Sequence, residues 1–144
     1  MSKPSALLQN SSLALVISRH PGNYRIVDAL QDSGFTTVET SEIKDCLSYL
    51  ENPDLSLVIV LQETKGRDDV DLLAELRNIS NAPIVMVGSG RPYGLVRGLV
   101  FGADIYLDRE VSTIELQSRI RALLRRFELT KKQRNERQSS VYYW

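Results

Sequence analysis

The sequence predicts an α/β protein with a doubly wound, five-stranded parallel sheet and helices on both of its faces. Five short apolar runs alternate along the chain with longer segments in which apolar residues recur at helical spacing. The runs are continuous rather than alternately polar and apolar, which is typical of strands buried on both faces of a parallel sheet. With 144 residues, 42% of them hydrophobic, the chain is long enough for one such domain with one substantial core.

The apolar runs give the expected strands. In chain order they are Leu13–Ile17, Phe35–Val38, Leu55–Leu61, Pro83–Val87 and Ile105–Leu107. The third run, LSLVIVL, is the strongest strand pattern in the chain. Right-handed crossovers between five such units favour the flavodoxin-like strand order 2-1-3-4-5. The core positions that we expect include Val58, Leu72, Val85 and Ile120.

Helical spacing and capping residues predict the helices between the strands. They are expected over Tyr24–Ser33, Ser41–Leu50, Asp69–Ile79, Pro92–Val100 and Thr113–Leu129. Ser41 is expected to cap the second helix, whose residues Ile43, Leu47 and Leu50 would then face the core. The last helix opens with an S-x-x-E capping box at residues 112–115.

The place to look for a functional site is the edge of the sheet where strands 1, 3, 4 and 5 end. In open parallel sheets, ligands bind in the crevice outside the carboxyl ends of the strands. The residues that follow these strands are Ser18–His20, Leu61–Glu63, Gly88–Gly90 and Asp108–Glu110.

Composition excludes several kinds of site and protein. Cys46 is the only cysteine and His20 the only histidine, so neither an internal disulfide nor a Cys/His zinc cluster is available. No apolar run approaches the roughly 20 residues that a membrane-spanning helix needs. The N-terminal segment lacks the basic and apolar regions of a signal peptide. We therefore expect a cytoplasmic protein with no membrane association.

Three segments are expected along the chain: an N-terminal extension over 1–11, a folded domain over 12–129 and a basic linker or tail over 130–144. The net charge is zero, but Arg119–Arg137 carries eight Lys or Arg residues against two Glu, a local charge of +6. This favours a solvated final helix and linker. Contact with nucleic acid is the alternative, although the tail contains no motif for base recognition. The last residues, 142–144, either open a further domain or form a docking peptide.

The resemblance to a known family lies mostly in the final third of the chain. The stretch VRGLVFGADIYLDREVSTIELQSRIRALLRR resembles the end of receiver domains in the winged-helix (OmpR/PhoB) class of bacterial response regulators. PIVMVGS resembles their fourth strand, and LVIVLQETKGRDDVDLLAELR follows their third strand and helix without gaps. The resemblance covers residues 12–126, and it implies the fold of a CheY-like receiver domain.

The resemblance also implies which residues should carry phosphoryl chemistry, and here the chain departs from the family. An acidic pair that holds Mg²⁺ is replaced by Ser18 and Arg19, and the phosphoaccepting Asp by Leu61. The Thr or Ser that senses the phosphoryl group is replaced by Gly88, with Ser89 one place on, and the pairing Lys by Arg109. Leucine has no lone pair to attack a phosphoryl donor, and arginine cannot ligate a cation.

We therefore expect a degenerate receiver with no bound metal, no cofactor and no enzymatic activity. Two alternatives stay open. Glu63 or Asp68 could act as a non-standard phosphoacceptor, or Arg19, Arg109 and the amides of Gly88–Gly90 could bind a small anion or metabolite. Tyr106 aligns with the aromatic residue whose rotamer follows phosphorylation in the family. Without a phosphate sensor, we interpret it as a half-buried strand residue.

The family's dimer surface consists of helix 4, strand 5 and helix 5. Charged residues remain there, but apolar residues replace a helix-4 Arg and a strand-5 Asp. The positions that we assign to this face are Leu95, Asp104, Ile105, Glu115, Arg119 and Arg121. An apolar centre favours a homodimer that forms without phosphorylation.

The functional hypothesis is an atypical response regulator in two-component signal transduction. It would act by homodimerisation or by binding a protein partner, in transcription regulation. Contact with DNA would come only through a separate effector domain.

Overall fold

The computed structural model describes residues 12–18, 24–62, 68–88 and 102–141, and within them it shows the predicted five-stranded sheet. All neighbouring strands are parallel, and their order is β2-β1-β3-β4-β5. The strands are β1 Ser12–Ile17, β2 Phe35–Thr40, β3 Leu55–Leu61, β4 Ile84–Gly88 and β5 Ile105–Asp108. The predicted fold class and strand order are therefore confirmed.

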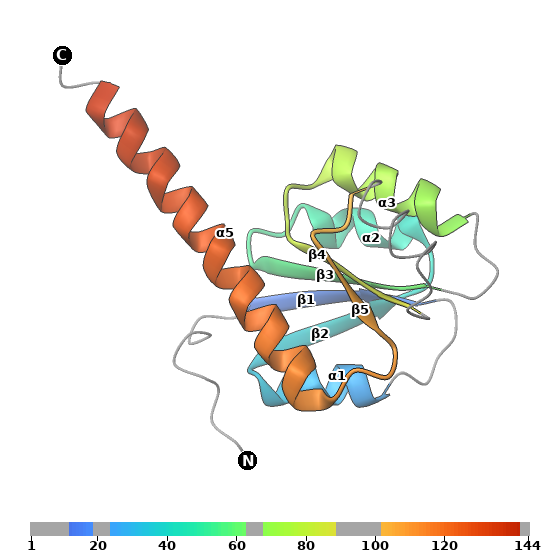
Figure 1. Ribbon diagram of the computed structural model, residues 1–144. Coiled ribbons are helices and arrows are strands. Elements are labelled where there is room, and N and C mark those ends of the chain that lie inside the picture. Colours follow the sequence, from blue (N-terminus) through green and yellow to red (C-terminus); the bar gives the residue numbers. More distant parts are fainter. Residues whose placement is uncertain (1–11, 19–23, 63–67, 89–101, 142–144) are drawn as a thin grey trace.

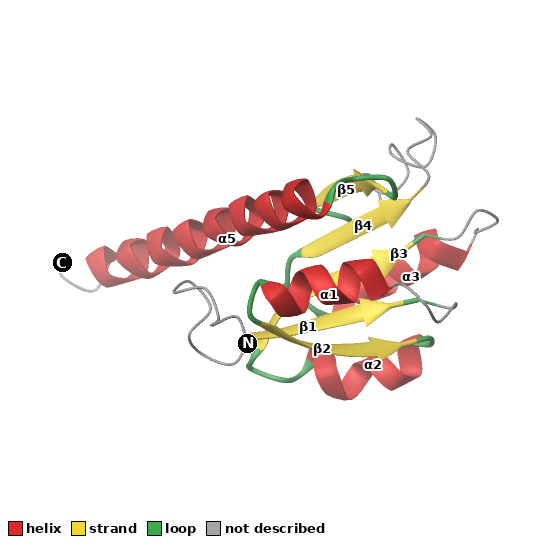
Figure 2. Cartoon of the chain, turned by 90° about the horizontal axis from the view of Figure 1, so that it is seen from below, coloured by secondary structure: helices red, strands yellow, loops and turns green. Residues whose placement is uncertain are grey.

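The helices lie on both faces of the sheet, with α1 and α5 on one face and α2 and α3 on the other (Figures 1 and 2). Their bounds are α1 Tyr24–Asp32, α2 Ile43–Leu50, α3 Asp68–Ile79 and α5 Thr113–Val141. The predicted helix Pro92–Val100 lies outside the described residues. In the described part of the chain, no helix is long and apolar enough to span a membrane.

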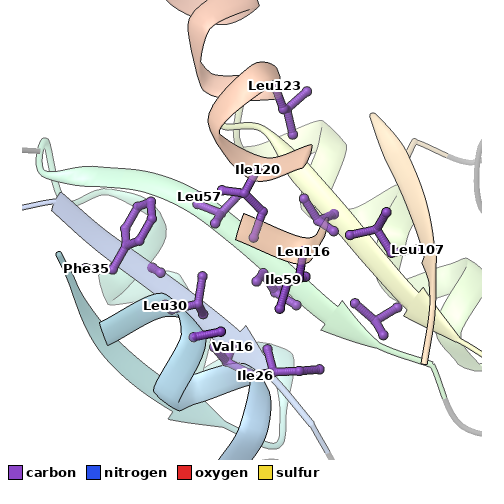
Figure 3. Close-up of a cluster of buried hydrophobic side chains, with 14 of the residues drawn as sticks. Val16, Ile26, Leu30, Phe35, Leu57, Ile59, Leu107, Leu116, Ile120 and Leu123 are labelled. Atoms are coloured by element: carbon purple, nitrogen blue, oxygen red, sulfur yellow. The ribbon is translucent and has the colours of Figure 1, made fainter. Parts of the chain in front are cut away.

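Two separate cores form because successive strand side chains point to opposite faces. The core beneath α1 and α5 contains Leu57 and Ile59 of β3 together with Leu116, Ile120 and Leu123 of α5 (Figure 3). The second core, beneath α2 and α3, takes the alternate residues of the same strands. Its members on β3, β4 and α3 are Val58, Val60, Ile84, Met86, Leu73 and Leu76.

The core predictions hold for three of the four positions. Val58 and Val85 are fully buried, and Ile120 is 3% exposed. Leu72 is only partly buried, because its helical neighbours Leu73 and Leu76 take the positions that face the sheet.

Helix α2 begins later and faces the core with a different stripe than predicted. Its N-cap is Glu42, not Ser41, and the side chain of Glu42 makes no capping hydrogen bond. Cys46 is fully buried, whereas Leu47 is 45% exposed, so the prediction of a core-facing Leu47 was wrong. Residues 43, 46 and 50 recur at i, i+3 and i+7, which fits helical packing as well as the predicted spacing does.

The buried thiol of Cys46 contacts Thr40 Oγ1 at 3.1 Å and donates to the carbonyl oxygen of Glu42 at 3.3 Å. Burial raises the pKa of the Cys46 thiol above its ordinary value. The hydrogen bond with Thr40 lowers this pKa, but by less than burial raises it. The side chain therefore stays protonated near neutral pH and packs as a small apolar group.

Helix α5 is longer than predicted, since it continues from Thr113 to Val141 instead of ending at Leu129. The segment after Leu129 contains neither Gly nor Pro and is rich in Lys, Arg, Gln and Glu, which favour helix. The predicted cap at its start is present, because Glu115 N donates to Ser112 Oγ at 3.1 Å. Beyond the sheet, the C-terminal half of α5 extends away from the rest of the domain (Figures 1 and 2).

Candidate functional site

The candidate site lies at the carboxyl edge of the sheet, where β1, β3, β4 and β5 end. Of the predicted site residues at this edge, Ser18, Leu61, Gly88 and Arg109 are described. Arg19, Ser89 and the alternative acceptor Glu63 lie outside the described residues, so their roles stay predictions.

The end of β3 presents an aliphatic side chain at the position that the resemblance assigns to the phosphoacceptor. Leu61 pairs in register with Val87 of β4 and is partly buried. Its side chain packs against the core beneath α1 and α5. At this position the strand therefore offers a hydrocarbon surface and no nucleophilic atom.

The next residue, Gln62, lies on the opposite face from Leu61 and reaches across the sheet. Its side-chain Oε1 accepts a hydrogen bond of 2.8 Å from the hydroxyl of Tyr106 on β5. Gly88, on β4 between them, has no side chain to block this contact. A Cβ built at Gly88 would lie 2.1 Å from the Tyr106 hydroxyl oxygen and 2.2 Å from Gln62 Oε1.

Arg109 follows β5 and binds backbone at the same edge. Its Nη2 donates to the carbonyl oxygen of Gln62 at 2.8 Å, and its backbone N–H donates to the carbonyl oxygen of Gly88 at 2.7 Å. From α1, the guanidinium of Arg25 donates to the carbonyl oxygens of Arg109 and Val111. The positive side chains here hold the loop after β5 against the strand ends.

The described residues at this edge do not fit a Mg²⁺ site, which needs oxygen ligands such as carboxylates. Ser18 is half-buried, and its backbone N–H donates to the carbonyl oxygen of Thr40. Leu61 and Gly88 offer no side-chain oxygen. In residues 12–18, 24–62, 68–88 and 102–141, no group of three His, Cys, Asp or Glu side chains could hold a metal ion.

The predicted dimer face is only partly described, because Leu95 lies outside the described residues. Strand β5 and the start of α5 border a shallow hollow of about 550 Å³. Its lining includes Ile105, Tyr106, Glu115 and Arg119. Glu115 and Arg119 are both exposed and pair at 3.5 Å along the helix.

Two residues that the sequence assigns to this face, Ile105 and Asp104, make contacts within the single chain. Ile105 is half-buried, since it packs against the core beneath α1 and α5. Asp104 Oδ2 accepts hydrogen bonds from Arg77 Nη2 at 2.8 Å and from the backbone N–H of Ile84 at 2.7 Å. Arg121, in contrast, is exposed.

The sequence placed Gln62 at this edge but predicted no contact for it, and it singled out neither Arg77 nor Arg25. The signal for Gln62 was available, because alternation along β3 places it on the same face as Val60 and opposite Leu61. Arg77 and Arg25 bind mostly backbone carbonyls far along the chain, and no sequence pattern marks such a contact.

Known response regulators are similar to this chain in sequence. The chain is 33% identical over 110 residues to the transcriptional regulatory protein CpxR of Escherichia coli, and this alignment covers 75% of the chain and 47% of CpxR. It is 31% identical over 101 residues to the phosphate regulon transcriptional regulatory protein PhoB of E. coli, covering 67% of the chain and 44% of PhoB. The chain thus spans about half the length of these relatives. No family model matches the chain.

Solved structures agree on the fold. A two-component response regulator from Clostridium difficile superimposes with a TM-score of 0.71 at 19% identity, covering 81% of this chain and 98% of that one. A CheY-like receiver domain protein from Methanospirillum hungatei gives 0.69 at 19% identity, with coverages of 84% and 99%. The chain is therefore a homologue of the CpxR and PhoB response regulators and has the fold of a CheY-like receiver domain.

Proposed function

We propose that this chain is a degenerate receiver domain that signals without accepting a phosphoryl group. The observation that carries the proposal is Leu61, an aliphatic residue packed against the core at the position of the phosphoacceptor. A hydrocarbon side chain cannot form an acyl phosphate, whatever donor or metal is supplied.

The neighbouring contacts support the same reading. The side chain of Gln62 is engaged by Tyr106, and its main-chain carbonyl by Arg109. Gly88 supplies no hydroxyl that could respond to a phosphoryl group. The described groups at this edge therefore bind one another, which favours a fixed conformation over a site that responds to phosphorylation or to a small anion.

For the whole protein, we propose an atypical response regulator in transcription control. The support is that its relatives CpxR and PhoB are named transcriptional regulatory proteins, and that the alignments cover 47% and 44% of their lengths. The receiver would act as a homodimer or through a protein partner, in the cytoplasm and without enzymatic activity. DNA would be bound only by a separate effector domain.

The test uses a small-molecule phosphodonor with Mg²⁺ and intact-mass spectrometry, and a conventional receiver domain serves as the positive control. We expect no phosphoryl adduct on the wild-type chain while the control receiver is labelled. An adduct that needs Mg²⁺ and is lost on acid-to-amide substitution, Glu63→Gln or Asp68→Asn, would overturn the proposal and establish a non-standard acceptor. A matched Leu61→Asp variant shows whether the missing carboxylate is the only obstacle.

A further inference from the structure

We propose that Gln62 and Tyr106 form a built-in lock, in which the Gln62 side chain holds the Tyr106 hydroxyl in the space that Gly88 leaves empty. The pair would fix Tyr106 in one orientation and thereby fix the surface of β5. This inference rests on the proposed function, since it names what takes the place of phosphorylation in setting the conformation at this edge.

Strand geometry brings the three residues to one face of the sheet. Val60 and Met86 belong to the core beneath α2 and α3, and Tyr106 packs against that same core. Side chains two residues apart on a strand share a face, so Gln62 and Gly88 continue the rows of Val60 and Met86. Met86 is also the register partner of Tyr106.

The absence of a side chain at Gly88 is a requirement of this arrangement. Besides the two oxygens of the pair, a Cβ at Gly88 would lie 2.9 Å from Tyr106 Cζ. Contacts this short are far below van der Waals separation, so any residue other than glycine must displace the tyrosine ring, the glutamine or both. Position 88 therefore decides whether the pair can form.

Gln62 is well placed to hold the ring because its own backbone is held on both sides. Its N–H donates to the carbonyl oxygen of Val87 at 2.8 Å, and its carbonyl oxygen accepts from Arg109 at 2.8 Å. Because the backbone is already fixed, only the side-chain torsions of Gln62 lose conformational freedom when it binds the hydroxyl.

The consequence reaches the surface through Tyr106. This residue also lines the hollow beside β5 and α5, together with Ile105, Glu115 and Arg119. We expect a ring that leaves the space over Gly88 to change the wall of that hollow, to which Tyr106 contributes. The Gln62–Tyr106 pair would thus couple the carboxyl edge of the sheet to the β5–α5 surface.

The first test measures the position of the ring. The six tyrosines are labelled with ¹³C in the ring, Tyr106 is assigned with Tyr106→Phe, and broadening by a soluble paramagnetic agent is recorded. Tyr24, which is 72% exposed, gives the reference for a solvated ring. The variants are Gln62→Met, which keeps the length but loses the amide acceptor, Gln62→Glu, which keeps an oxygen acceptor, and Gly88→Ala.

In the wild type, we expect the Tyr106 signal to be protected relative to Tyr24. Gln62→Met and Gly88→Ala should increase its broadening toward the Tyr24 level, and Gln62→Glu should restore protection. A Tyr106 ring that is as protected in Gln62→Met as in the wild type would overturn the lock. If Gly88→Ala does not fold, the two Gln62 variants still decide the question.

The second test is a double-mutant cycle of Gln62→Met and Tyr106→Phe by urea unfolding. A direct hydrogen bond predicts a coupling of about twofold to tenfold in the unfolding equilibrium constant. Additive effects of the two substitutions would contradict the pair. Neither readout involves a phosphodonor. If both tests find no Gln62–Tyr106 pair and the wild-type chain gives no phosphoryl adduct, only this inference is refuted. An adduct on the wild-type chain refutes the proposed function, whatever the ring does.

Discussion

At the residue scale, Asp104 belongs to the predicted dimer face, and its carboxylate also stabilises the fold. Its carboxylate joins α3 to the strands, because it binds Arg77 and the backbone N–H of Ile84. Arg77 also donates to the carbonyl oxygens of Ala82 and Gly102. The partly buried ion pair thus holds the segments before β4 and before β5 together.

Replacement of Asp104 by Ala should lower the free energy of unfolding by about 1–3 kcal/mol, because it leaves the Ile84 N–H without its acceptor and removes the carboxylate partner of Arg77. Asp104→Asn should cost less, since its amide oxygen can still accept from Ile84. Urea unfolding at low protein concentration measures both variants.

The control for this prediction is Arg119→Ala, which removes an exposed ion pair with Glu115. Its cost should be about 0.5 kcal/mol or less. If Asp104→Ala costs no more than this control, the carboxylate does not hold the fold as described.

Sequence pattern predicted residue-level features only where they repeat along one element. The run over Leu55–Leu61 is strand β3 residue for residue, and its alternation places Leu61 and Gln62 on opposite faces. The contacts of Arg77 have no such pattern, because its partners Ala82, Gly102 and Asp104 lie in loops outside α3. The roles assigned to Arg19 and Ser89 stay predictions.

At the element scale, α2 and α5 show why helix faces and ends are harder to predict than helices. Two stripes of α2 have acceptable helical spacing, and only packing against the sheet selects Cys46 over Leu47. In α5, the loss of apolar residues after Leu129 predicts that the helix ends there. The helix instead continues to Val141, because local propensity still favours it there.

The extension of α5 should contribute little to stability. Twenty-nine residues give a helix of about 43 Å, and among the side chains that the structure describes, the last ones that pack against the core are Leu124 and Phe127. A helical segment without tertiary packing is marginal in water. Ending the chain after Thr130 should therefore change the free energy of unfolding by less than about 0.5 kcal/mol. Amides of Lys131–Ser139 should exchange quickly with solvent in the intact chain.

A chain that ends after Arg126 is the matched control for this prediction. It lacks Phe127, which is partly buried against the core, and should lose about 1–2 kcal/mol. Equal stabilities of the two truncated chains would contradict the contribution of Phe127. Slow amide exchange across Lys131–Ser139 would mean that the extension is stabilised by tertiary contacts.

At the scale of the whole molecule, the question is which surface joins two copies of the chain. The face of β5 and α5 offers a hollow lined by apolar and charged groups. We expect a two-fold homodimer through the predicted helix Pro92–Val100, β5 and α5 that forms without phosphorylation. Leu95 and Ile105 would supply its apolar centre.

Substitution of Leu95 or Ile105 by Asp should give a folded monomer, as measured by sedimentation velocity. Burial of an apolar side chain contributes about 1.5–3 kcal/mol, and two-fold symmetry counts each position twice. The dissociation constant should therefore rise at least about a hundredfold for Leu95→Asp. Ile105 is half-buried within the single chain, so its effect on association should be smaller and accompanied by some loss of stability.

Leu47→Asp is the matched control for the dimer, because Leu47 is 45% exposed on α2, on the other face of the sheet. It should leave association unchanged. Added salt should also weaken the dimer little, because a rim pair such as Glu115–Arg119 contributes only about 0.2–1 kcal/mol. A wild-type chain that stays monomeric at high concentration would exclude this dimer. A dimer that persists with both Asp substitutions but dissociates in salt would indicate an interface made by charged residues. The exposed Arg121 is the first candidate for such an interface.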